Sequence, residues 1–92
     1  MTTTKMHRVK INPFFYYELS TGAKTFEIRK DDRDYRVGDI ITFTDPTGKE
    51  AYPGAWVITF KLTARLFPEG LKDGYCLLSL KPLNLDQERK DL

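Results

Sequence analysis

Alternating apolar and polar residues predict five β-strands along the chain. In residues 7–11, His7, Val9 and Ile11 fall on one side, and the basic residues Arg8 and Lys10 fall on the other. Because successive side chains of a strand point to opposite faces, this alternation is typical of a half-buried strand. The same pattern predicts further strands over residues 24–30, 40–44, 55–67 and 75–81.

The longest alternation lies in residues 55–67, where every even-numbered position from Trp56 to Leu66 is apolar. We therefore expect these positions to share one buried face. A strand of this length in so small a protein has to bend and twist, as barrel strands do. The last predicted strand carries Cys76, Leu78 and Leu80 on its apolar face.

One short helix is predicted between the first two strands. Asn12 is a good helix N-cap, and Pro13 is well tolerated at the first helical position. Gly22 can take the left-handed conformation that ends a helix, so the helix should span residues 13–20. Further along, residues 45–48 (Asp-Pro-Thr-Gly) are typical of a type I turn and predict the tip of a hairpin.

Strands joined by short turns favour a mostly antiparallel sheet, and closing the sheet into a barrel removes its exposed edges. We therefore expect a mainly β (α+β) fold, a small barrel of five to six strands with a short helix after the first strand. A chain of 92 residues supports a single domain. We expect a flexible leader over residues 1–5, the domain over residues 6–82 and a polar tail over residues 83–92.

Composition narrows the possible function classes. The single cysteine, Cys76, excludes an internal disulfide and the common cysteine zinc sites, and its apolar surroundings favour a buried, inert thiol. The chain has no glycine-rich phosphate loop, metal-ligand cluster or nucleophile elbow, so we expect neither a metal nor a cofactor. No apolar run approaches the roughly 20 residues of a membrane helix, and no signal peptide is evident. We therefore expect a cytoplasmic protein without a membrane partner.

The net charge of +2 does not by itself indicate a nucleic-acid partner. Its distribution is uneven, because residues 1–30 carry six basic and two acidic side chains, whereas residues 31–60 carry three basic and six acidic ones. The basic N-terminal third permits a local positive patch.

Candidate chemistry concentrates in residues 22–29, where a helix-ending glycine leads directly into a charged strand. Thr25, Glu27 and Arg29 alternate with Phe26 and Ile28, so the three polar side chains share one face. Glu27 and Arg29 can pair, which would hold the guanidinium toward a phosphate or a base edge. The spacing alone fits a solvated outer face of a sheet equally well, and this alternative stays open.

The segment Gly22-x-Lys24-x-x-Glu27-x-Arg29 resembles the signature of the ASCH domain, a relative of the PUA fold. A wider set of residues resembles DUF3850, a family of small bacterial and phage proteins catalogued as a domain of unknown function. That set contains the strand with His7 and Lys10, residues 24–30, Asp32 with Arg33, and the Val-Gly-Asp turn at residues 37–39. The resemblance extends over residues 7–81.

This resemblance implies a PUA-like or ASCH-like β-barrel with a cationic cleft between the barrel and the first helix. In ASCH proteins such a cleft is proposed to bind RNA or a nucleotide-like ligand. Here the resemblance implies Lys24 at the entrance and Glu27 and Arg29 on one wall, and Arg8 and Lys10 could extend the positive surface. An exposed tyrosine could stack a base, the candidates being Tyr16, Tyr17, Tyr35 and Tyr52.

A small hydrolase is the alternative. ASCH-type amidohydrolases that act on N4-acetylcytidine resemble this chain in size and in their Gly-x-Lys-Thr core, and Lys24 matches their catalytic lysine, with Thr25 as a possible helper. However, their catalytic threonine falls where this chain has Glu27, and the helical segment that bears their catalytic carboxylate has no counterpart here, so Thr25 and Glu27 would have to substitute for these groups. A ribonuclease would use Lys24 and Arg29 to stabilise charge and His7 as the acid or base.

A further alternative is a protein-interaction module whose aromatic residues form the surface for a protein partner. The sequence also leaves open whether His7 lies in the cleft or in the core.

Overall fold

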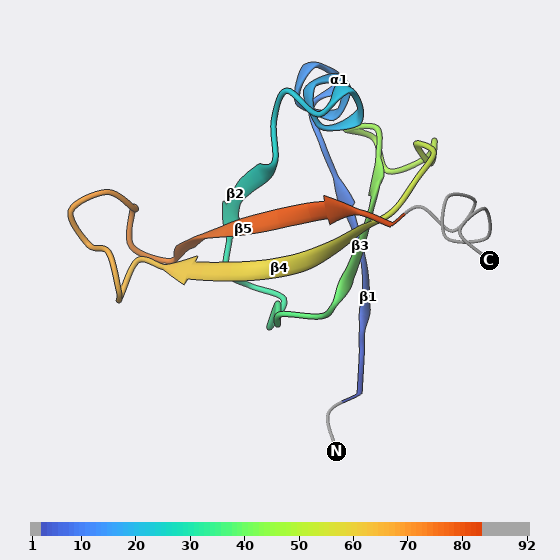
Figure 1. Cartoon of the computed structure of the whole chain (residues 1–92). Coiled ribbons are helices and arrows are strands. Elements are labelled where there is room, and N and C mark those ends of the chain that lie inside the picture. Colours follow the sequence, from blue (N-terminus) through green and yellow to red (C-terminus); the bar gives the residue numbers. More distant parts are fainter. Residues whose placement is uncertain (1–2, 84–92) are drawn as a thin grey trace.

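The computed structural model describes residues 3–83 of the chain. In chain order it contains β1 (Met6–Lys10), α1 (Pro13–Thr21), β2 (Phe26–Lys30), β3 (Ile40–Thr44), β4 (Trp56–Thr63) and β5 (Tyr75–Pro82). Figure 1 shows α1 above one end of a strongly curved sheet, with the β4–β5 hairpin projecting to one side. The mainly β fold and the short helix after the first strand are thus confirmed.

The five strands form a mixed half-barrel. Their order in the sheet is β1-β3-β4-β5-β2, so β1 and β2 are its two edges. Three of the four pairings are antiparallel, whereas β1 pairs with β3 in parallel. A parallel pair needs a long connection, and α1 with β2 provides it. Within residues 3–83, β1 and β2 make no ladder with each other, so the expected barrel is open along one seam.

Local signals set both ends of α1. The side chain of Asn12 accepts a hydrogen bond from the amide of Phe14 at 2.8 Å, and Pro13 begins the helix. Gly22 ends it in the left-handed conformation, with φ of 85°, and its amide donates to the carbonyl of Leu19. The helix therefore begins where the sequence predicts and ends one residue later.

The core fills the inner face of the half-barrel. Strands β1, β3, β4 and β5 contribute apolar side chains to this core. Leu19 from α1 and Tyr35 from the loop before β3 complete it. Tyr16 connects α1 to this core. Its ring packs on Trp56, and its hydroxyl donates a hydrogen bond to the carbonyl of Pro53 at 2.6 Å. Tyr35 is 2% exposed, so the hypothesis that it stacks a base is wrong.

The strand β4 is shorter than predicted, ending at Thr63. Its register with β5 shifts between Ile58 and Phe60. Such a bulge adds a residue to one strand and interrupts its alternation, so Trp56 and Ile58 are buried whereas Phe60 is 53% exposed. The prediction that all even-numbered positions share one face is therefore wrong beyond Ile58.

Both ends of the described chain lie close to the sheet. Before β1, the amide of Lys5 donates to Asp39 Oδ1 at 3.1 Å and its carbonyl accepts from Ile40. The predicted polar tail lies outside the described residues except for Leu83, whose amide donates to the carbonyl of Ala55. Among residues 3–83 there is no helix of the length and hydropathy needed to cross a membrane.

Candidate functional site

Glu27 and Arg29 of β2 point into the half-barrel, and the alternating positions of the strand point out. Glu27 is 4% exposed, whereas Phe26 and Ile28 are 38% and 50% exposed. The antiparallel register with β5 causes this orientation, because it sets Glu27 opposite Leu78 and Arg29 opposite Cys76, both buried. Residues directly opposite each other in a ladder share a face of the sheet. The alternative of a solvated charged face is therefore wrong for Glu27.

Glu27 pairs with two basic side chains, one at each carboxylate oxygen. Its Oε1 accepts a hydrogen bond from Lys24 Nζ, and its Oε2 accepts one from Arg29 Nη1 at 3.2 Å. Lys24 Nζ also lies 4.4 Å from the centre of the Phe15 ring on α1. The trio carries a formal charge of one positive unit, and the guanidinium has five N–H donors, more than its one bond to Glu27 uses.

The charge of Arg29 acts on the buried phenol of Tyr35. Burial raises the pKa of Tyr35, and the positive charge of Arg29 acts in the opposite direction. The contact that holds the guanidinium of Arg29 in the structure is its hydrogen bond to Glu27 Oε2.

A cleft of about 380 Å³ lies along the open seam between the two edge strands. Three parts of the chain form its walls: the end of β1 with the start of α1, β2 with the loop after it, and the start of β5. The lining residues are Lys10, Ile11, Asn12, Phe15, Glu27, Ile28, Arg29, Lys30, Asp32, Arg33 and Tyr75. Arg33 Nη1 donates to the carbonyl of Arg8 at 3.4 Å, so the loop after β2 reaches β1 across the seam.

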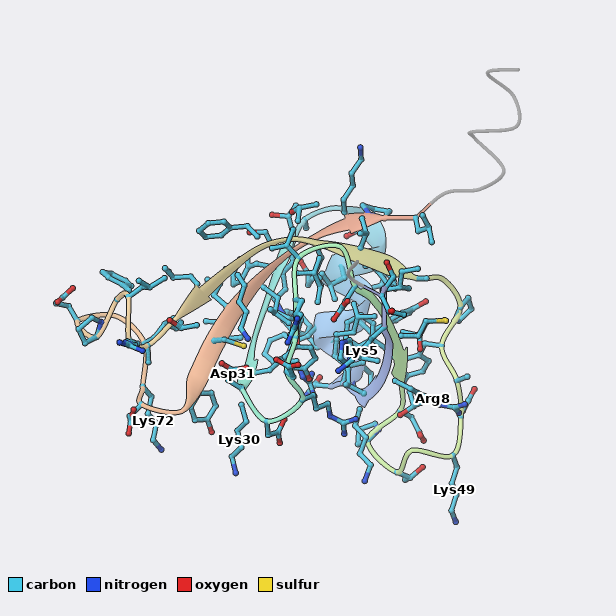
Figure 2. The ribbon with its side chains drawn as sticks, turned by 90° about the horizontal axis from the view of Figure 1, so that it is seen from below. Lys5, Arg8, Lys30, Asp31, Lys49 and Lys72 are labelled. Atoms are coloured by element: carbon cyan, nitrogen blue, oxygen red, sulfur yellow. The ribbon has the colours of Figure 1, made fainter. Side chains whose placement is uncertain are left out.

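The lining of the cleft is cationic and partly aromatic. Its basic residues, Lys10, Arg29, Lys30 and Arg33, outnumber its two carboxylates. Figure 2, seen from below, shows Lys30 extending from the end of β2 into solvent. Phe15 and Tyr75 add flat apolar surface. Because ligand pockets usually measure about 300–1,000 Å³, the cleft has the size and charge for a small anion with an aromatic part.

A known protein family matches most of the chain. Residues 6–80 match a family described as a domain of unknown function, DUF3850. The chain belongs to the DUF3850 family. The match covers nearly the whole range over which the sequence motifs resemble that family. No curated protein matches the chain.

In this DUF3850 domain His7 lies in the core. It is 7% exposed, its Nε2 lies 2.8 Å from Asp39 Oδ2, and its ring packs on Tyr35 with centroids 4.8 Å apart. Burial alone raises the pKa of Asp39, but hydrogen bonds from His7 and from the amides of Lys5 and Arg36 hold it below its usual value. The pair links β1 to the start of β3, and His7 is not among the residues that line the cleft.

The other candidate residues of the DUF3850 domain divide between two hollows and the outer surface. Lys10, Glu27 and Arg29 line the cleft. Lys24 lines an adjoining, mostly apolar hollow of about 270 Å³ that shares Phe15, Glu27 and Ile28 with the cleft. Arg8 is exposed and points away from the core, and Thr25 is exposed and lines neither hollow.

Sequence reasoning missed several residues of the cleft. Asp32 and Arg33 stand in the motif shared with DUF3850, but only the structure shows that their loop turns back to β1. Tyr75 lines the cleft because it is paired with Lys30 in the β2–β5 ladder. The sequence offers no signal for that pairing, since the two residues are far apart in the chain.

The thiol of Cys76 takes no part in the cleft. It is fully buried, and burial, with a smaller effect from the charge of Asp31, raises its pKa to about 11. Within residues 3–83, no group of three or more His, Cys, Asp or Glu side chains is arranged to hold a metal ion.

Proposed function

We propose that this DUF3850 domain binds single-stranded RNA or a nucleotide-like ligand in the cleft between β1, α1 and β2. The observation that carries the proposal is the inward orientation of β2, which sets Glu27 and Arg29 in the wall of an open, cationic seam. The same motif in a half-barrel also supports a relationship to the ASCH domains of the PUA-like superfamily, which stays part of the proposal.

Different residues of the cleft lining suit different parts of a ligand. Lys10 and Arg33 both line the cleft and suit phosphate oxygens. Arg29, fixed by Glu27, presents N–H donors to a base edge or a second phosphate. Phe15 and Tyr75 offer rings on which a base can stack, a contact worth about 1–3 kcal/mol per base.

Binding of a fluorescently labelled single-stranded RNA and of nucleoside monophosphates tests the proposal. We expect Lys10→Ala/Arg33→Ala to weaken RNA binding and to lower the slope of log affinity against log salt by about 1.4, since each phosphate contact contributes about 0.7 for single strands. Arg29→Ala should weaken both RNA and mononucleotide binding.

The matched control is Arg65→Ala/Lys81→Ala, which removes the same two charges from exposed positions outside the cleft. We expect its affinity to stay close to that of the wild type. Equal affinity in the wild type and the Lys10/Arg33 variant, or equal losses in the two double variants, would contradict binding at this cleft.

The hydrolase alternative has weaker support. His7, the acid or base of the ribonuclease hypothesis, is bonded to Asp39 away from the cleft lining. Lys24 Nζ is engaged by the Glu27 carboxylate and the Phe15 ring, contacts that it would have to leave in order to attack a substrate. Incubation with N4-acetylcytidine and with single-stranded RNA tests this alternative: product release that is lost in Lys24→Ala would establish it.

A further inference from the structure

The wall of the cleft presents hydrogen-bonding groups in a defined order. Lys24 Nζ donates to Oε1 of Glu27 and Arg29 Nη1 donates to Oε2, so the carboxylate lies between two donors. All three groups keep free capacity, because an ammonium has three N–H donors, a guanidinium has five, and a carboxylate has about four acceptor positions. A ligand therefore meets a donor, an acceptor and a second donor in turn. We call these three side chains the polar row.

The polar row lies where two hollows meet. Arg29 lines the cleft, Lys24 lines the adjoining apolar hollow, and Glu27 lines both. Phe15 and Ile28 also line both hollows, so apolar surface surrounds the carboxylate. The side chains of Lys24 and Arg29 are 16% and 21% exposed, and that of Glu27 is 5% exposed. Because water competes little at such positions, hydrogen bonds to a ligand are strengthened, and a mismatched ligand group is penalised.

We propose that the polar row recognises the Watson–Crick edge of a uracil ring, an inference that rests on the function proposed above. This edge carries an acceptor, a donor and an acceptor, namely O4, N3–H and O2. Lys24 donates to one carbonyl oxygen, Glu27 accepts from N3–H, and Arg29 donates to the other carbonyl oxygen. Single-stranded RNA exposes this edge of its bases, so a protein can read it directly.

Each of the other standard bases leaves one of the two cations without an acceptor. Guanine meets the polar row with O6 and N1–H, but its amino group then turns a donor toward the second cation. Cytosine and adenine offer an amino donor to Glu27 and a ring nitrogen to one cation, and the cation on the other side of the carboxylate stays unpaired. A polar group left unpaired in a partly buried site costs binding free energy.

NMR titration of the full chain with the four nucleoside monophosphates tests the inference. We expect uridine monophosphate (UMP) to bind at least about tenfold more tightly than CMP, GMP or AMP, which is the usual size of discrimination by paired hydrogen bonds to a base. N3-methyl-UMP lacks the N–H that donates to Glu27, and it should also bind at least about tenfold more weakly than UMP. Short strands of oligo-U should exceed oligo-C in affinity, and oligo-dT, which has the same base edge, shows whether the ring is read in RNA alone or also in DNA.

Arg29→Ala tests the order of the groups within the protein. Its shortened row keeps only Lys24 and Glu27, which guanine satisfies as well as uracil does. UMP should therefore bind more weakly than to the wild type, and its preference over GMP should fall below about threefold. Lys81→Ala is the control, because it removes one charge from an exposed position of β5 outside both hollows, and it should keep the wild-type preference.

Failure of this inference is distinguishable from failure of the proposed function. Equal affinities for the four nucleotides, or an N3-methyl-UMP that binds like UMP, overturn the reading of uracil and leave nucleotide binding in the cleft standing. A chain that binds no nucleotide and no strand overturns both. Circular dichroism confirms that Arg29→Ala is folded, and a folded variant that keeps the wild-type preference for UMP overturns the inference. If the variant does not fold, the comparison of UMP with N3-methyl-UMP on the wild type decides.

Discussion

Replacing Glu27 with glutamine tests the buried ion pairs at the wall of the cleft. Glutamine keeps the shape of the side chain but removes its charge and turns an NH₂ group toward one of the two cations. Removing one partner of a buried ion pair costs about 3–5 kcal/mol. Here the side chains of Lys24 and Arg29 are 16% and 21% exposed and can regain water, and the amide oxygen still accepts one bond. We therefore expect a loss of about 2 kcal/mol.

Thermal unfolding followed by circular dichroism measures this loss. In a domain of this size, 1 kcal/mol shifts the Tm by about 4–8 °C, so the Tm of Glu27→Gln should fall by about 8–16 °C. The control is Glu69→Gln, an exposed carboxylate with no ion pair to any described residue. Its stability should change by less than about 0.5 kcal/mol.

A Tm of Glu27→Gln within about 2 °C of the wild type would refute the reasoning, because the carboxylate would then not be buried between two cations. The same variant separates a structural role from a binding role. If the variant, kept folded below its Tm, binds RNA as tightly as the wild type, then Glu27 supports the sheet and does not orient Arg29 toward a ligand.

Three further measurements test other parts of the structure. The lowered pKa of Asp39 in the folded protein implies stabilisation that is complete above the unfolded value of 3.8 and is lost as pH falls through the folded-state pKa. Urea midpoints between about pH 2 and 6 should show this loss, and Asp39→Asn should flatten it. Cys76, with a pKa of about 11, should react with iodoacetamide at pH 8 at least about 100-fold more slowly in the folded than in the unfolded protein. Leu78→Ala should cost about 2–5 kcal/mol, whereas Leu66→Ala, at a position 72% exposed, should cost less than about 0.5 kcal/mol.

Elements set by local signals were predictable from the sequence. Asn12, Pro13 and Gly22 define the ends of α1 through contacts within a few residues, and the helix lies where they predict. The first and last strands follow their alternation, with Val9 and Leu78 buried. Glu27 and Arg29 come together for the same reason, because a two-residue spacing places them on one face of β2, and Lys24 reaches Glu27 from the segment just before the strand.

Features that depend on distant partners were not predictable. The bulge after Ile58 has no local signature in an unbroken apolar alternation, and it appears only in the pairing with β5. The side to which β2 turns Glu27 likewise depends on Leu78, which is paired with it from the far end of the chain. Tyr75 and Arg33 line the cleft for similar reasons. Tyr75 lies there because it pairs with Lys30 in the β2–β5 ladder, and Arg33 because its loop returns to β1.

The edge position of β2 explains how a small domain tolerates charges on an inward face. In a central strand, Glu27 and Arg29 would be covered from both sides, and burying even a paired charge there is expensive. At the edge, one side of β2 is open to the seam. Lys24 and Arg29 therefore keep partial access to water, while the Glu27 carboxylate is paired with both of them. Because side chains alternate, the same choice turns Phe26 and Ile28 outward. A single register thus produces a cationic cleft on one side and an apolar face on the other, and a slip of one residue would abolish both.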